Sequence, residues 1–353
     1  MQIFIPYYIS FFILYMFISA RKIKLSFGTA NVFLFLFLFL FVILVGSRDF
    51  DLKGDTQTYL RVYYNIKHSI DVGRLEKGFV FLLKMLSFIE LTNRQLLYAL
   101  ASLQAFIWYF FIVYFFKDNR KKILFVMLLA SSFFIYNTGT NVLRQGFAIP
   151  LALLSMAFYI NKKWFLSLLF LGIATSFHMT AAIIPLTYLL SQKLKFNLTF
   201  YFVILIVFTI SSAAGLFEFF NDIFYSTFGD YDYLFSESAF EAYRVGFRPD
   251  FWLFSLFPLV LYFFLSDDAK ENNLLFIKQY ILLFCGFIFL FSFPYSDRFG
   301  LYAWVMMLVL VSNFSCSYKI RMHGEDLITA LLILTYGLLG FFFSPLMQFN
   351  YYL

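Results

Sequence analysis

The sequence predicts an all-α, polytopic integral membrane protein with about 11–12 transmembrane helices. Of its 353 residues, 62% are hydrophobic and only 13% are charged, whereas soluble domains average about 45–50% apolar and about 25% charged. The apolar residues form long continuous runs and do not alternate with polar residues, which favours helices over a barrel because each helix satisfies its own backbone in lipid. We expect residues 1–353 to form a single transmembrane domain.

The apolar runs set the expected helices in order. A crossing takes about 20 apolar residues. The first run is followed by Arg21, Lys22 and Lys24 and has no small-residue cleavage site, so it predicts a retained helix with its N-terminus outside, not a removed signal peptide. The predicted helices are residues 2–20, 29–46, 95–116, 123–140, 143–160, 164–190, 198–217, 251–266, 274–293, 299–316 and 327–345.

The charges between these runs predict the topology. With the N-terminus outside, the cytoplasmic connections hold 15 of the 27 Lys and Arg residues and six of the 20 acidic residues, as the positive-inside rule expects. Both termini are then extracytoplasmic. This excess of Lys and Arg on the cytoplasmic side requires residues 164–190, which have lysines at both ends, to enter and leave the membrane on the same side. We therefore expect a broken or re-entrant hairpin of two short helices with its break near Thr175–His178.

Two long outward loops are expected at residues 47–94 and 218–250. Within the first, residues 78–89 are apolar but short, which favours an interfacial helix. The second alternates carboxylates with tyrosines at Asp230-Tyr231-Asp232-Tyr233. Such a segment can bind sugars, and it is equally ordinary in a solvated loop.

Polar residues at the outer helix ends are the candidates for function. Arg48 can hold a phosphate, with Asp55 and Tyr59 contacting a sugar, although a glycine-bent solvated loop explains the same residues. Arg144 lies between Asn141 and Gln145. Inserting an arginine at membrane depth costs at least about 2.5 kcal/mol of free energy. Arg144 therefore faces either an anion in an aqueous cavity or the interface, by snorkelling.

His178 and Arg298 complete the candidate set. His178 falls at the expected helix break, where an imidazole can titrate near neutral pH and act as a base, or can simply pack. Arg298 and Tyr302 share a helix face. Together with Arg48 and Arg144, Arg298 gives three guanidinium groups at one predicted depth, which suits a pyrophosphate. The competing explanation is chance, because polar residues gather at helix ends.

Several classes of site are absent from the sequence. It has no phosphate-binding P-loop, no dinucleotide glycine pattern and no metal-ligand spacing. Cys285 and Cys316 lie in apolar runs and provide no disulfide framework. We therefore expect no metal, no cofactor and no nucleic-acid partner, and we disfavour an ATP-driven or nucleotide-sugar enzyme.

Five short pieces of the sequence carry a family resemblance. They are Arg48 with Gly54-Asp55-Thr56 and Tyr59; Glu76-Lys77-Gly78-Phe79; Asn141 with Leu143-Arg144-Gln145 and Ala148; Phe177-His178-Met179-Thr180-Ala181; and Arg298 with Tyr302. In this order, over residues 48–302, the chain resembles the EpsG/Wzy-type family of bacterial polysaccharide polymerases. That family usually has proline where this chain has Lys77.

The resemblance implies a metal-independent glycosyltransferase in the bacterial inner (plasma) membrane. Its donor and acceptor are expected to be undecaprenyl-pyrophosphate-linked oligosaccharides, joined on the extracytoplasmic face into O-antigen, capsular or exopolysaccharide. Membrane lipids and a chain-length regulator are the other expected partners. The alternatives are a flippase for lipid-linked oligosaccharides and an O-antigen ligase-like transferase. A flippase is disfavoured because the sequence has no inverted repeat and its candidate residues lie at the outer face, not the midplane.

Each candidate residue has an expected role. Arg48, Arg144 and Arg298 are expected to bind the pyrophosphate, and His178 or Asp55 to take the proton from the acceptor hydroxyl. The remaining candidates are expected to contact the substrate: Tyr59, Glu76, Asn141, Gln145 and Tyr302.

Overall fold

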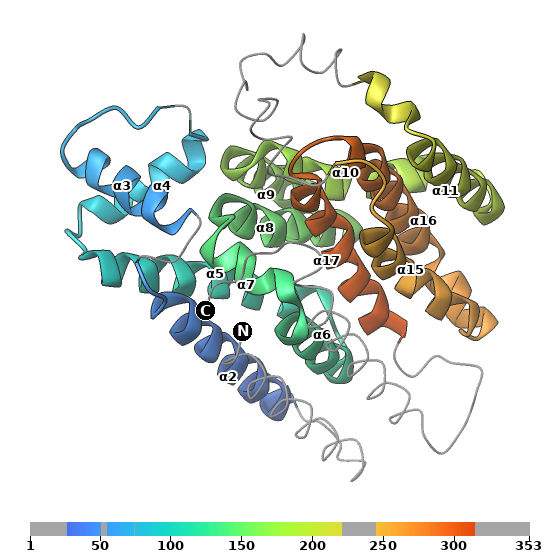
Figure 1. The fold of residues 1–353 in the computed structure, drawn as a ribbon. Helices are drawn as coiled ribbons and strands as arrows, with labels where there is room; N and C mark the ends of the chain where they lie inside the picture. The colour runs from blue at the N-terminus through green and yellow to red at the C-terminus, as the bar shows by residue number, and fades with distance from the viewer. Residues whose placement is uncertain (1–26, 51–54, 74, 221–244, 315–353) are drawn as a thin grey trace. The chain divides into compact units, whose positions relative to one another are not determined.

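The computed structural model describes residues 27–50, 55–73, 75–220 and 245–314. All regular secondary structure in these ranges is helical, with thirteen α-helices and three short 3-10 helices (Figure 1). The predicted all-α class is therefore confirmed. The expected helices at 2–20 and 327–345, most of the expected outward loop 218–250, Gly54 and Cys316 lie outside the described residues.

Four described segments are long and apolar enough to cross a membrane. They are Gly28–Gly46 in α2 (Phe27–Gly46), α5 (Asn93–Phe115), α8 (Leu143–Ile160), and Asp267–Ser292, which contains α16 (Asp267–Phe289). Three shorter apolar helices also match expected spans, namely α9 (Trp164–Phe177), α11 (Leu198–Ala213) and α15 (Pro249–Phe263). The chain is thus a membrane protein, and its total number of crossings stays a prediction.

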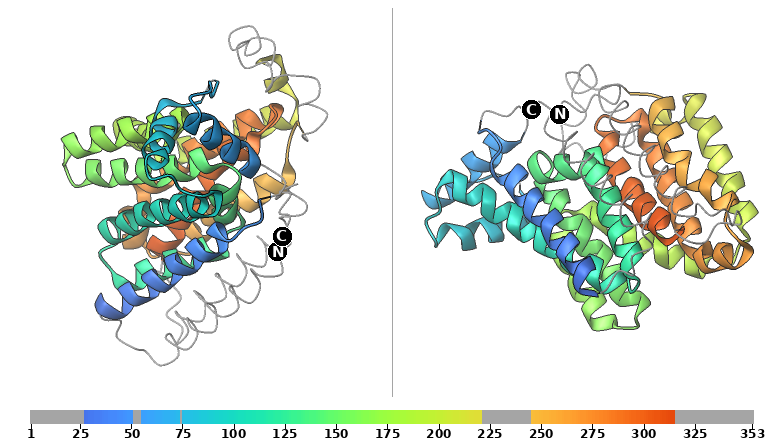
Figure 2. Two further views of the ribbon diagram at one scale, coloured as in Figure 1. Left: turned by 90° about the vertical axis from the view of Figure 1, so that its left-hand side faces the viewer. Right: turned by 90° about the horizontal axis from the view of Figure 1, so that it is seen from below.

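The described chain divides into two compact units, one up to Pro185 and one from Leu186 onward. In the first unit α8 packs along α9, α2 packs along α5, and α5 packs against α8. The pairing of α8 with α9 is visible in both Figure 1 and Figure 2. In the second unit α16 packs against α11 and α17 (Ser296–Phe314). Its core surrounds the buried Trp304, whose Nε1 donates to Ser255 Oγ at 3.0 Å.

The first expected outward loop, residues 47–94, contains two helices, α3 (Thr56–Lys67) and α4 (Lys77–Ser87) (Figure 1). The predicted helix at 78–89 corresponds to α4, whereas α3 was not predicted. The buried positions of α3 follow helical spacing and are Thr56, Tyr59, Val62 and Tyr63. The helix was not predicted because many of its other residues are polar, so it contains no apolar run. A shared apolar core holds α3 and α4 against α5 and α8, and it includes Tyr63, Phe79, Leu83, Leu96, Leu100 and Phe147.

Two expected helices differ from the structure. The run 123–140 is interrupted at Ser132, giving α6 (Asn119–Ser131) and α7 (Phe133–Thr140). Ser132 adopts an extended backbone (ψ 129°), and its Oγ donates to the Leu129 carbonyl at 2.6 Å. The segment 274–293 begins earlier, because Ser266 caps α16 by accepting from the Ala269 N–H. Residues 267–273, which were expected to connect two helices, are therefore helical.

The expected break in the run 164–190 is present. Helix α9 ends at Phe177, a 3-10 turn covers Met179–Ala182, and α10 (Ile183–Lys193) follows. His178 stands between them with an extended backbone (φ −162°, ψ 113°). Whether α9 and α10 return to the same membrane face stays a prediction.

Candidate functional site

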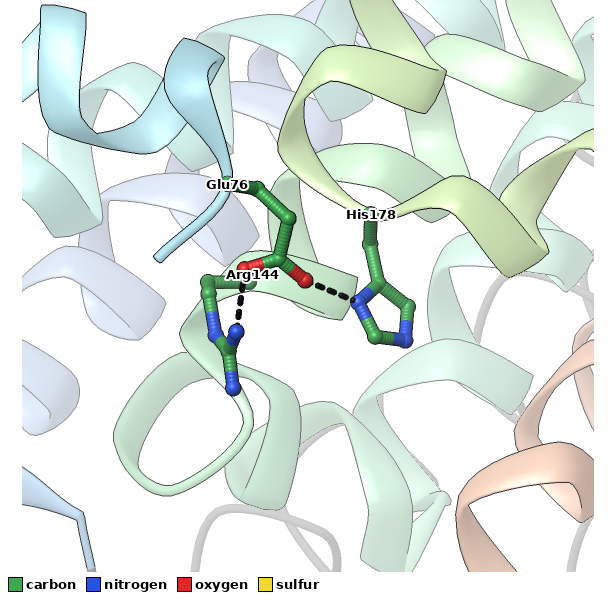
Figure 3. A network of polar contacts seen from close by, with 3 residues as sticks. All are labelled: Glu76, Arg144 and His178. Carbon is green, nitrogen blue, oxygen red and sulfur yellow. Dashed lines mark hydrogen bonds and ion pairs between the residues drawn. The ribbon is translucent and has the colours of Figure 1, made fainter. Parts of the chain in front are cut away.

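One carboxylate in the first unit joins an arginine and a histidine from distant parts of the sequence. Glu76 stands at the N-cap of α4, Arg144 in the first turn of α8, and His178 at the end of α9. Arg144 Nη1 pairs with Glu76 Oε2, and His178 Nδ1 lies 2.9 Å from Glu76 Oε1 (Figure 3). The partners are 68 and 102 residues from Glu76 in sequence, so only the tertiary fold brings them together.

The protonation of Glu76 follows from this environment. Its side chain is 26% exposed. Burial alone raises the pKa of a carboxyl group. Here the hydrogen bond from His178 and the positive charge of Arg144 outweigh burial and lower the pKa of Glu76 from 4.5 to about 2. The carboxylate is therefore ionised throughout the physiological pH range.

Aromatic rings hold the segments that carry these residues. Tyr59 on α3 meets Phe79 on α4 edge to face with 5.3 Å between ring centroids. Phe177 stacks on Phe147 of α8, also at 5.3 Å, and Phe79 meets Phe177 at 6.5 Å. Because Phe177 directly precedes His178, this packing fixes the backbone from which the imidazole projects.

Gly78 allows the first turn of α4 to lie against the last turn of α9. A Cβ atom added at Gly78 would lie 2.8 Å from the backbone carbon and oxygen of Ser176, which is closer than real Cβ contacts. Any larger residue therefore pushes the two helices apart. The close approach brings Glu76 within hydrogen-bonding distance of His178.

Arg48 forms a second cluster just beyond α2. It is 4% exposed. Its Nε donates to Thr56 Oγ1 at 3.1 Å and its Nη1 donates to the Val45 carbonyl at 2.7 Å, whereas the buried Nη2 has no hydrogen-bond partner among the described residues. Burial lowers the pKa of Arg48 from 12.5 to about 10, so the guanidinium remains charged at neutral pH.

Tyr59 connects the two clusters. Its side chain is 3% exposed and forms a hydrogen bond with the Arg144 side chain. It also lies close enough to Arg48 to interact with its charge. The structure thus brings Arg48 and Arg144 to the same tyrosine, with His178 reached through Glu76.

Asn141, Asp55 and Gln145 lie around these clusters. The Asn141 Oδ1 accepts from the Asp55 backbone N–H at 2.8 Å, which ties the start of α3 to the end of α7. Gln145 is buried next to Arg144 on α8. Sequence reasoning missed Arg94, whose Nη1 donates to the carbonyls of Gly46 at 3.0 Å and Arg48 at 2.6 Å. Its position directly before the predicted helix 95–116 was the only available signal.

Arg298 and Tyr302 belong to the second unit, on α17. Tyr302 is 1% exposed, and the guanidinium carbon of Arg298 lies 4.5 Å from the ring centroid of Tyr295. Tyr295 has a positive φ of 60°, an uncommon conformation for a residue with a side chain. The meeting of Arg298 with Arg48 and Arg144 stays a prediction. Among the described residues no group of three or more His, Cys, Asp or Glu could hold a metal ion.

Replacing Gly78 by alanine is expected to destabilise the protein by about 1–3 kcal/mol, the usual effect of overpacking. Gly172→Ala on α9 is the matched control, because a Cβ there meets nothing within 4 Å. Thermal unfolding of both variants in one detergent measures the difference. Equal melting temperatures would contradict the close-approach argument.

The Glu76 ion pair predicts an acid-dependent loss of stability. Because the pKa of Glu76 falls from 4.5 to about 2 on folding, its contribution, at most about 3 kcal/mol, is fully present above pH 4.5 and is lost as the pH falls toward 2. The difference in melting temperature between wild type and Glu76→Gln should therefore shrink as the pH falls below 4.5. The exposed Glu90, changed to Gln, is the control and should show no such trend.

Comparison with known proteins adds one finding to this geometry. The model of the EpsG family matches residues 31–353, a range that contains every residue of both clusters as well as Arg298 and Tyr302. No curated protein and no solved structure matches the chain. Since the match covers nearly the whole sequence, this membrane protein belongs to the EpsG family.

Proposed function

We propose that this protein is a metal-independent glycosyltransferase that polymerises undecaprenyl-pyrophosphate-linked oligosaccharide repeat units on the extracytoplasmic face of the bacterial plasma membrane. The product is O-antigen, capsular or exopolysaccharide. One observation carries the proposal: two arginines interact with Tyr59, and one of them shares a carboxylate with a histidine. Membership of the EpsG family supports it.

The two arginines are suited to a pyrophosphate. Arg48 keeps a buried Nη2 without a hydrogen-bond partner among the described residues, and a buried donor left unpaired costs about 1–3 kcal/mol. A phosphate oxygen would satisfy it through a charge-assisted hydrogen bond. Arg144 contacts Glu76 through one terminal nitrogen, while in Figure 3 the other points away from Glu76. Arg298 is the proposed third contact, from the second unit.

The chemistry follows from where charge develops. The acceptor hydroxyl attacks the anomeric carbon of the donor, and the bond from that carbon to the pyrophosphate oxygen breaks. Negative charge grows on the departing pyrophosphate, so fixed cations lower the barrier. Removing one donor from comparable oxyanion sites costs about 2.7–4 kcal/mol. His178 or Asp55 takes the hydroxyl proton.

A flippase for the same lipid-linked oligosaccharides is the second candidate, because the helix broken at His178 is a feature of transporter binding sites. Deletion of the gene separates the two functions. Loss of a polymerase leaves single repeat units on the outer leaflet, whereas loss of a flippase traps them inside.

Arg144→Ala, Arg48→Ala and Arg298→Ala should each slow polymerisation about 10²–10³-fold, leaving single repeat units on the lipid. Arg48→Lys should also be impaired, because an ammonium cannot reproduce the planar fork. The assay is the product ladder formed by purified protein in liposomes with a defined lipid-linked repeat unit. Arg61→Ala, at an exposed position of α3, is the control. Wild-type ladders from the Arg144 variant would overturn the pyrophosphate role.

His178→Asn and His178→Ala should both stop polymerisation in the same assay, because neither side chain can accept the proton. His68→Asn is the matched control, since His68 is exposed and its ring stacks on Tyr64 of its own helix. If His178→Asn polymerises normally, the histidine is a packing residue and Asp55 becomes the preferred base.

A further inference from the structure

The geometry points to Glu76 as a positioning residue that holds neutral His178 in one tautomer, with the proton on Nδ1 and the lone pair on Nε2, so that Nε2 is the base of the transfer reaction. The inference rests on the proposed function and deepens it. It assigns the base, which sequence reasoning left open between His178 and Asp55, and it gives Glu76 a role toward the histidine in place of a direct contact with substrate.

The hydrogen bond between Glu76 and His178 can run in only one direction. Glu76 Oε1 lies 2.9 Å from His178 Nδ1. An ionised carboxylate can only accept hydrogen bonds, and Glu76 is ionised at neutral pH because it pairs with the permanently charged guanidinium of Arg144. Nδ1 must therefore be the donor. In a neutral imidazole the proton then resides on Nδ1, and Nε2 carries the lone pair.

The other ring nitrogen of His178, Nε2, points away from the ion pair. In Figure 3, Nε2 lies on the edge of the ring away from Glu76 and Arg144. No described residue of the first unit hydrogen-bonds to it, and the His178 side chain is 24% exposed. The basic nitrogen is thus available to a hydroxyl group, while the opposite nitrogen is occupied.

The carboxylate of Glu76 is itself held in position by its neighbours. Arg144 pairs with the second carboxylate oxygen, Glu76 Oε2. The close approach of Gly78 to Ser176 sets the position of α4 against α9. The histidine backbone is fixed by hydrogen bonds on both sides, from its N–H to the Ala174 carbonyl at 3.0 Å and from the Ala181 N–H to its carbonyl at 3.1 Å. A carboxylate that is itself oriented can fix the angle of the imidazole as well as its tautomer.

The reaction balances with these groups alone. The acceptor oxygen forms a bond to the anomeric carbon and its proton passes to Nε2, while the carbon–oxygen bond to the pyrophosphate breaks and its electron pair leaves with the lipid pyrophosphate. Glu76 stays ionised and stabilises the imidazolium by charge, as the carboxylate does in a Ser-His-Asp triad. The imidazolium then releases its proton to water.

The experiment reads the tautomer directly. The chain has three histidines, so ¹⁵N-histidine labelling of the full-length protein in lipid nanodiscs gives few signals, and His178→Asn identifies the relevant pair. We expect wild type to show the Nδ1–H tautomer and Glu76→Ala to shift toward Nε2–H. Glu76→Gln retains an acceptor oxygen and tests the charge separately. Glu90→Ala, at an exposed position, is the control and should leave the signals unchanged.

Kinetics on the same variants completes the test. Glu76→Ala and Glu76→Gln should lower kcat about 10²-fold or more, the size of a general-base contribution, with KM within about threefold of wild type. A wild-type Nε2–H tautomer would overturn the inference whatever the activity. A raised KM with unchanged kcat would also overturn it, because Glu76 would then act through Arg144 on binding. Failure of wild type to polymerise would instead overturn the proposed function and leave the tautomer measurement intact.

Discussion

The ionised carboxylate of Glu76 in a partly buried position is the constraint on which the first unit depends. A charge removed from water is costly unless opposite charge and hydrogen bonds replace the lost hydration. Arg144 and His178 supply both, and they come from helices far apart in sequence. The ring contacts among Phe79, Phe147 and Phe177 and the glycine contact at Ser176 place the segments so that the carboxylate is compensated.

Arg48 presents the opposite arrangement, because its burial is incompletely compensated. Two of its nitrogens have partners, while Nη2 has none among the described residues. Native structures contain few such groups, and they persist where function opposes stability. Arg144 is thus already paired within the protein, whereas Arg48, which also interacts with Tyr59, retains unused hydrogen-bonding capacity.

Much of the helical framework could be predicted from sequence because long apolar runs leave few alternatives. Helix α8 covers the predicted residues 143–160, and the break at His178 follows from lysines at both ends of one run. The interruption at Ser132 was not predictable, since a single serine hydrogen bond accompanies it. The site was predictable only as a set of polar residues at helix ends. Glu76 entered only through a resemblance, and its pairing with Arg144 and His178 depends on tertiary packing.

The contact between Gly78 and Ser176 also determines which part of this region can vary. Because α4 is anchored by α9 and by the apolar core, which Val72 and Leu75 also contact, the exposed positions from His68 to Gly73 do not determine where Glu76 stands. In that segment Gly73 is surrounded by open space, and doubling the length of a flexible connection costs only about 0.6 kcal/mol. Insertions and deletions between α3 and α4 should therefore be tolerated among homologues, whereas the spacing from Glu76 to Gly78 should not vary.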